Sequence, residues 1–162
     1  MKRTRLLTLA LGTVVLLAAA SASAQAPPPY GSAINLEQAK KALAGAEAEA
    51  RKNNWSVVIA ILDSGGQLVL LQRMDNTQWG SVEVAQDKAR SAVAYRRPTK
   101  VFSDLIAQGG ANMRLLNLSG ASLIEGGIPI VVDGKIVGGI GVSGVTAQQD
   151  NQIGQAGVDA LK

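Results

Sequence analysis

Apolar residues recur three or four positions apart over three long stretches of the chain, the spacing that places them on one face of a helix. These stretches predict helices over residues 35–53, 80–97 and 145–162, and a shorter apolar segment predicts one over residues 99–107. Each long stretch has a residue near its start that can cap the first turn: Asn35, Ser81 and Thr146. Gln follows Asn35 and Thr146 at the third position, as in a capping box.

Runs of β-branched residues and Leu predict two hairpins. Residues 55–75 hold two such runs on either side of Asp63-Ser-Gly-Gly66, and residues 128–142 hold two more around Asp133-Gly134, a strong hairpin signal. Residues 112–125 are compatible with a helical turn followed by a further short strand. The elements do not alternate as βαβ units. We therefore expect an α+β fold with a mainly antiparallel sheet of about five strands, flanked by helices.

Gly139, Gly141 and Gly144 match the dinucleotide fingerprint G-x-G-x-x-G. They fall on the second arm of the predicted hairpin, whereas that fingerprint works on the first strand of a parallel βαβ unit. We therefore exclude a dinucleotide site. Glycine within a strand marks a bulge or a close approach. Two interpretations stay open: the last helix packs across Gly139 and Gly141, or a flat ligand lies against them.

The small residues of the first predicted helix also allow two interpretations. Its faces are rich in alanine beyond the apolar stripe, including Ala42, Ala44 and Ala48. These residues either let a second surface approach closely, such as a neighbouring subunit, or serve helix propensity alone.

The N-terminus is organised as a secretory signal peptide. Three basic residues precede the uncharged run 6–20, and Ala22 and Ala24 occupy the positions that a signal peptidase reads. We expect cleavage after Ala24, a periplasmic or secreted location, and no stable membrane insertion of the product; an uncleaved anchor is the alternative. Residues 25–34 then form a Pro-rich tether and residues 35–162 a single domain.

The composition excludes several classes of function. The chain carries a net charge of +4, but three of its 16 basic residues lie in the predicted signal, so the rest is nearly neutral. Aromatic residues make up 3% of the chain, and we expect no nucleic-acid partner. The sequence contains no Cys and no His, which excludes disulfides, thiolate or imidazole metal ligands and His-based acid–base catalysis.

Three blocks of the sequence resemble the GlcG/HbpS family, a group of small domains associated with haem binding. The blocks are "VVIAILDSGGQLVLLQRMD", "SVEVAQDKARSAVAYRRPT" and "GGIPIVVDGKIVGGIGVSGVTAQQD", and they match in order. The resemblance implies a profilin-like fold and assembly into a homo-oligomer. For an exported chain it further implies binding of haem or another tetrapyrrole, as a haem-sensing or haem-degrading accessory with a possible membrane sensor partner.

The candidate haem site follows from this resemblance and from the residues available. With neither His nor Cys, an iron ligand must come from Tyr, Met or less usual donors. Tyr95 is the candidate iron ligand, and the neighbouring Arg96 and Arg97 could bind the haem propionates. The competing interpretation is a surface tyrosine packed against the sheet. The further cofactor-binding candidates are Met74, which could instead fill a gap in the core, Arg73, Gly139 and Gly141.

An alternative function uses a different pair of residues. Arg73 and Lys88 could face a small anionic ligand in one cleft, where a desolvated Lys88 could move protons. The chain would then be a small enzyme or binding protein for an organic acid, with Lys88 and Arg73 as its catalytic residues. The competing interpretation is a structural ion pair of Lys88 or Arg73 with Asp75. The sequence leaves open whether the chain is an enzyme.

Overall fold

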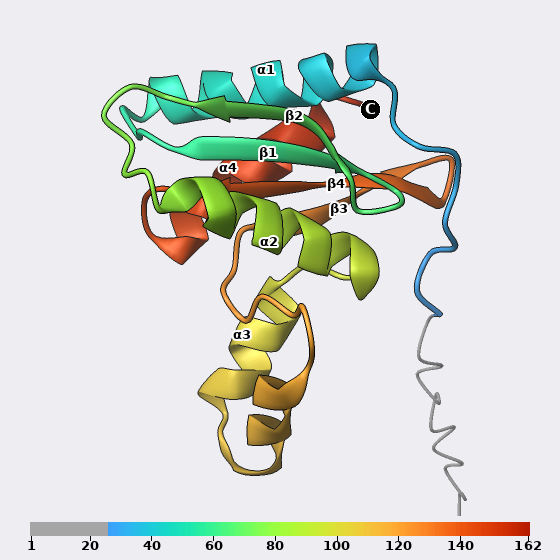
Figure 1. Cartoon of the computed structure of the whole chain (residues 1–162). Coiled ribbons are helices and arrows are strands. Elements are labelled where there is room, and N and C mark those ends of the chain that lie inside the picture. The colour runs from blue at the N-terminus through green and yellow to red at the C-terminus, as the bar shows by residue number, and fades with distance from the viewer. Residues whose placement is uncertain (1–25) are drawn as a thin grey trace, which may run out of the picture.

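The computed structural model describes residues 26–162, so the predicted signal peptide lies outside the described residues. Within them the chain forms four strands, four α-helices and one 3-10 helix (Figure 1). In chain order the elements are α1 (Leu36–Lys52), β1 (Val58–Asp63), β2 (Leu68–Arg73), α2 (Ser81–Ala94), α3 (Lys100–Ala107), η1 (Gly110–Asn117), β3 (Gly127–Val132), β4 (Lys135–Ser143) and α4 (Ala147–Asp159).

The four strands form one antiparallel sheet in the order β2-β1-β4-β3. Both predicted hairpins are confirmed, and so is the α+β class. The expectation of about five strands is wrong. The predicted helical turn is present as the 3-10 helix η1, but no strand follows it before β3. Gly120 and Gly126 in this stretch adopt positive φ values of 70° and 122°, which turn the chain out of an extended path. Short apolar runs do not by themselves distinguish strand from helix.

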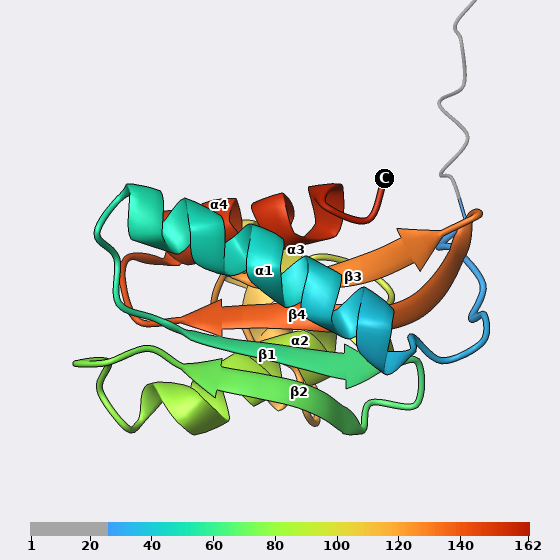
Figure 2. The same ribbon diagram turned by 90° about the horizontal axis from the view of Figure 1, so that it is seen from above.

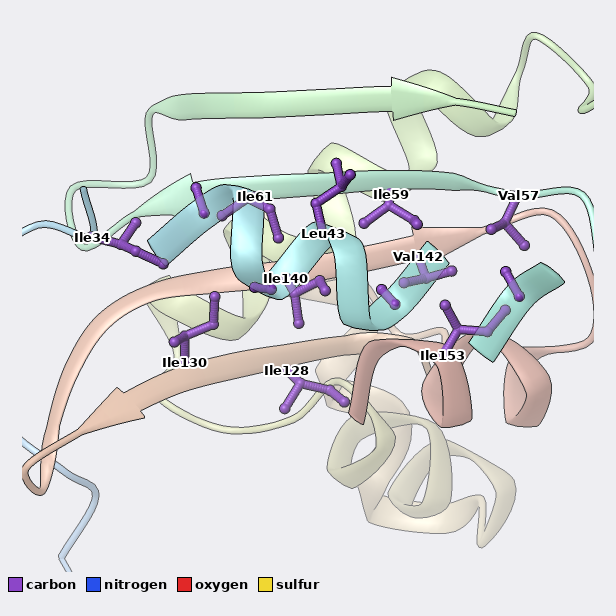
Figure 3. Close-up of a cluster of buried hydrophobic side chains, with 14 residues drawn as sticks. Ile34, Leu43, Val57, Ile59, Ile61, Ile128, Ile130, Ile140, Val142 and Ile153 are labelled. Atoms are coloured by element: carbon purple, nitrogen blue, oxygen red, sulfur yellow. The ribbon is translucent and has the colours of Figure 1, made fainter. Parts of the chain in front are cut away.

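Helices cover both faces of the sheet. Figures 1 and 2 show α1 and α4 side by side over one face and α2 over the other. β1 is apolar at successive positions because it is buried on both sides: Ile59 and Ile61 pack towards α1, while Val58 and Ala60 pack with α2. Figure 3 shows the larger core, in which Leu43, Ile140 and Ile153 meet between the sheet, α1 and α4. α2 packs against the opposite face through the second, smaller core.

The strand glycines let α2 lie directly against β4. A Cβ atom at Gly139 would lie 2.7 Å from Val93 Cγ2 and 2.9 Å from the carbonyl oxygen of Ala89, and one at Gly141 would overlap the carbonyl oxygen of Ala85. A helix does pack across these glycines, as one of the two interpretations held. The helix is α2, however, and not the last helix, which lies on the opposite face of the sheet. The space that a flat ligand would need over Gly139 and Gly141 is filled by the backbone of α2.

Two of the three predicted helix caps are confirmed. Asn35 with Gln38 and Thr146 with Gln149 each form a complete capping box. The Ser81 cap is wrong, because Gly80 is the N-cap of α2 and Ser81 is its first helical residue. The buried Ser81 hydroxyl instead accepts a hydrogen bond from Ser143, which fastens α2 to the end of β4.

The small residues of α1 allow another helix of the same chain, α4, to pack closely against it. A Cβ atom at Gly157 of α4 would lie 2.8 Å from the carbonyl oxygen of Ala42 and 3.2 Å from the Cβ atom of Ala46. Ala44 and Ala48 remain exposed. The surface that approaches α1 closely is thus α4.

The Pro-rich segment before α1 is bonded to the domain. Tyr30 forms a parallel bridge with Ile136, where β4 extends beyond the end of β1, and the Tyr30 hydroxyl donates to the carbonyl oxygen of Val93 at 2.9 Å. The segment therefore joins β4 to the C-terminal end of α2. Across residues 26–162, no helix has both the length and the apolar character needed to cross a membrane.

Candidate functional site: a cleft between α2 and the 120–124 loop

The candidate site is a cleft of about 450 Å³ between α2 and the loop formed by residues 120–124. One wall is the outer face of α2, where Val84, Asp87 and Arg90 follow one another at helical spacing. The other wall is the loop, which brings the apolar side chains of Leu123 and Ile124. The cleft thus has largely apolar walls with one cationic and one anionic side chain on the helix.

The loop belongs to an arm that projects from the sheet, made of α3, η1 and residues 118–124 (Figure 1). Tyr95, directly after α2, fastens this arm. Its hydroxyl donates to the carbonyl oxygen of Ser119 at 2.6 Å, and its ring meets Phe102 of α3 edge-on, with centroids 5.3 Å apart. Because Ser119 precedes the loop directly, Tyr95 sets the position of the wall opposite α2.

Arg90 is the group in the cleft that could hold an anion. Its guanidinium contacts the Asp87 carboxylate at 3.0 Å, but the two side chains are 48% and 63% exposed. An exposed ion pair of this kind contributes little stability and is readily rearranged. The guanidinium can therefore turn to a carboxylate of a bound ligand and form the stronger forked contact with it.

The sequence analysis missed this cleft. The spacing of Val84, Asp87 and Arg90 on α2 was visible in the sequence as a second face of the helix. The facing loop was not, because residues 120–124 come about 30 positions later and reach α2 only through the fold.

Tyr95 and its two arginine neighbours make different contacts, although Arg97 stays beside Tyr95, since its Nε donates to the Tyr95 carbonyl oxygen at 3.0 Å. Arg96 lies over the ring of Tyr30 at 5.8 Å, whereas Arg97 lies over the ring of Phe102 at 5.7 Å. Tyr95 packs against Phe102 and the arm rather than against the sheet. Tyr95 and Arg97 thus share a contact with Phe102, while the Arg96 side chain lies at Tyr30.

Met74 and Arg73 lie at another part of the molecule. Met74 is half-buried against the main core and lines a different cavity of about 260 Å³ with Trp55 and Arg51. Arg73 is exposed at the end of the edge strand β2. Neither residue lines the cleft beside α2.

Lys88 is sealed in the interior. Its side chain is 1% exposed, and its ammonium group donates to Asp150 Oδ2 at 2.8 Å and to the carbonyl oxygen of Val142 at 2.9 Å. The partner is thus Asp150 of α4, not Asp75, which is exposed; the predicted pairing with Asp75 is wrong for Lys88. Burial raises the pKa of the Asp150 carboxyl above its usual value, while Lys88 and the N–H of Val145 act in the opposite direction. This ion pair joins α2 to α4.

Fold and cleft together define a class of protein: a small α+β domain with a ligand-sized, mostly apolar cleft beside a helix that packs on the sheet. Within this class, the chain belongs to the family described as haem degrading protein HbpS-like, whose model matches residues 34–159. The resemblance noted in the sequence is thereby confirmed.

Relatives and solved structures agree with this assignment. Protein GlcG of Escherichia coli K12 is 40% identical over 110 residues, which cover 68% of this chain and 81% of that protein. The crystal structure of HbpS is 32% identical, covering 82% of this chain and 92% of that one with a TM-score of 0.74. The crystal structure of a PduOC–haem complex is 28% identical, covering 79% and 94% with a TM-score of 0.71.

Proposed function

We propose that this protein binds haem in the cleft between α2 and the 120–124 loop. The observation that carries the proposal is the PduOC–haem complex, because that domain has the same fold as this chain over most of both lengths. The family description, haem degrading protein HbpS-like, points to the same cofactor.

The cleft fits the cofactor by its size and its chemistry. Its volume lies within the range of cofactor sites, and its apolar walls suit the face of a porphyrin. Arg90 can hold a propionate. The side chains that could offer iron an oxygen atom are Asp87 and Ser122 in the cleft, and Tyr95 behind the loop. Haem bound there would supply a redox-active iron, and the protein would orient the ring and shield one face from water.

The test is a haemin titration of the purified protein, followed by its Soret absorption. We expect saturable binding, weakened about tenfold in Arg90→Ala, since one charge-assisted hydrogen-bonded pair is worth roughly 1.5–3 kcal/mol. Arg51→Ala is the matched control, because Arg51 is also an exposed helical arginine paired with an acid on its own helix. Equal affinity of the wild type and Arg90→Ala, or nonspecific partitioning alone, would contradict the proposal.

We further propose that the protein is exported and acts outside the cytoplasm. The support is the sequence of residues 1–24, with its basic start, apolar run and small-residue cleavage site. The mass of the purified protein tests this directly, since cleavage after Ala24 removes those residues. An exported haem-binding domain is suited to report on haem to a membrane sensor, and we propose this as its class of partner.

The organic-acid alternative loses its predicted site. Lys88 is buried in an ion pair, and Arg73 lies exposed on the outermost strand, so the two do not face one ligand. We therefore do not propose Lys88 and Arg73 as catalytic residues.

A further inference from the structure

A second hollow runs along the open edge of the sheet. We call it the β3 groove. It has a volume of about 300 Å³ and lies where the end of α2, the outer strand β3 and the end of α4 come together. Its walls include Pro98, Pro129, Val131 and Val158. Pro129 has no N–H to donate to an added strand. The groove is therefore better suited to bind the apolar part of a ligand than to pair with a further β-strand.

Arg96 at the mouth of the β3 groove has an unusual backbone conformation. It follows the C-cap of α2 and has a φ of 52°. The N–H of Arg96 donates to the carbonyl of Val93, and that of Arg97 donates to the carbonyl of Ala92. These bonds form the Schellman motif, in which this position is usually glycine. Among residues 26–162, the other non-glycine residues with positive φ are Asn54, Asn76 and Asp133, types that tolerate this conformation.

An arginine at this position therefore carries a conformational cost that glycine would avoid. Its side chain is set at the groove by the ring of Tyr30, 5.8 Å from the guanidinium carbon. None of the ion pairs formed within residues 26–162 involves Arg96. Lys162, the other cation at the groove, is paired with Asp159 at 2.5 Å. Arg96 is thus the uncompensated positive charge beside an apolar hollow.

We infer that the β3 groove binds an amphipathic carboxylate, with its apolar body against Pro129, Val131 and Val158 and its carboxylate on Arg96. The planar guanidinium group matches a carboxylate in geometry. A small inorganic anion would leave the apolar walls uncovered, so the ligand should also carry an apolar part. A hollow of this size accommodates a medium-length aliphatic acid. This site is separate from the proposed haem cleft, because the residues that line the two do not overlap.

Decanoate, kept below the concentration at which it forms micelles, is the probe. Its binding to the full-length protein is followed in ¹H–¹⁵N spectra, with decanol as the uncharged comparison. We expect saturable shifts at β3 and the end of α4. Arg96→Gly should raise the dissociation constant for decanoate about tenfold and leave decanol unaffected. Arg97→Gly, one position along and outside the groove, should bind decanoate as the wild type does.

Arg96→Gly also separates loss of binding from loss of folding. Glycine is the usual residue at this position of the motif, so the thermal unfolding midpoint should stay the same or rise. Arg96→Asn, which also tolerates the conformation, should show the same loss of decanoate binding. Unchanged decanoate affinity in these variants would overturn the inference. Shifts confined to the α2 cleft, or displacement of decanoate by haemin, would also overturn it, because the groove would not then be a separate site.

Discussion

At the scale of single residues, Tyr95 makes a contact that its position in the sequence did not suggest. A phenol beside two arginines is a reasonable iron ligand in a chain without His or Cys. In the structure its hydroxyl donates to the carbonyl oxygen of Ser119 and holds the loop that forms one wall of the cleft. Ligation of iron by the phenolate would require that hydrogen bond to be given up.

Replacement of Tyr95 by Phe distinguishes these two roles. If Tyr95 fastens the loop, Tyr95→Phe should weaken haemin binding several-fold without moving the absorption bands of the bound form, because a lost hydrogen bond is worth roughly 0.5–1.5 kcal/mol. Tyr30→Phe is the control, since Tyr30 also donates to a backbone carbonyl but lies outside the cleft. A change in band positions confined to Tyr95→Phe would instead identify Tyr95 as the iron ligand.

At the scale of elements, α2 is the part of the molecule on which the candidate sites depend. One face lies against the glycines of β4, the next supplies Val84, Asp87 and Arg90 to the cleft, and its C-terminal end presents Arg96 to the β3 groove. The buried pair of Lys88 with Asp150 joins this helix to α4. Such a pair adds little net stability, but leaving one charge without its partner is costly.

Lys88→Met should therefore lower the free energy of unfolding by roughly 3–5 kcal/mol, because Asp150 remains buried without its cation. The double variant Lys88→Met with Asp150→Asn should recover a large part of this loss, since Asn removes the charge and still accepts from Val145. Urea denaturation measures both. Lys40→Met, which breaks an exposed ion pair with Glu37, should change stability by less than about 1 kcal/mol. Equal destabilisation in the single and double variants would show that the pair is not the origin of the effect.

At the scale of the whole molecule, the projecting arm carries apolar side chains that the rest of the chain does not cover. Met113, Leu116 and Leu118 are between 36% and 60% exposed on η1 and directly after it. Clustered exposed apolar residues mark surfaces for association. We propose that the chain forms a homo-oligomer, as the family resemblance implies, and that this arm is the surface of contact.

A charge placed on the arm tests this proposal. Leu116→Glu should shift the protein towards the monomer in sedimentation velocity, because a carboxylate would have to be desolvated in the contact. Leu36→Glu is the control, as Leu36 is 49% exposed but lies at the start of α1, away from the arm. A wild-type protein that sediments as a monomer, or equal behaviour of the two variants, would contradict an interface at the arm.

Local patterns predicted the elements well. The two hairpin turns, the capping boxes at Asn35 and Thr146, and the helix positions depend on residues within a few positions of one another, and the structure confirms them. The helical turn predicted near residue 112 is present as η1, but the short strand predicted after it is absent, because a short apolar run has no periodicity that separates a strand from irregular backbone. Local patterns also misplaced the cap of α2 by one residue, because Ser81 bonds to Ser143, 62 positions away.

By itself, the sequence determined the α+β class, the family and the chemistry that an absence of His and Cys excludes, since these follow from composition and short-range pattern. Only the tertiary structure decided which residues share a site. It placed Lys88 on Asp150, α2 on the β4 glycines, and Arg90 opposite the 120–124 loop. Each of these contacts joins residues about 30 or more positions apart, and side chains that distant meet only after the sheet has fixed the helices around it.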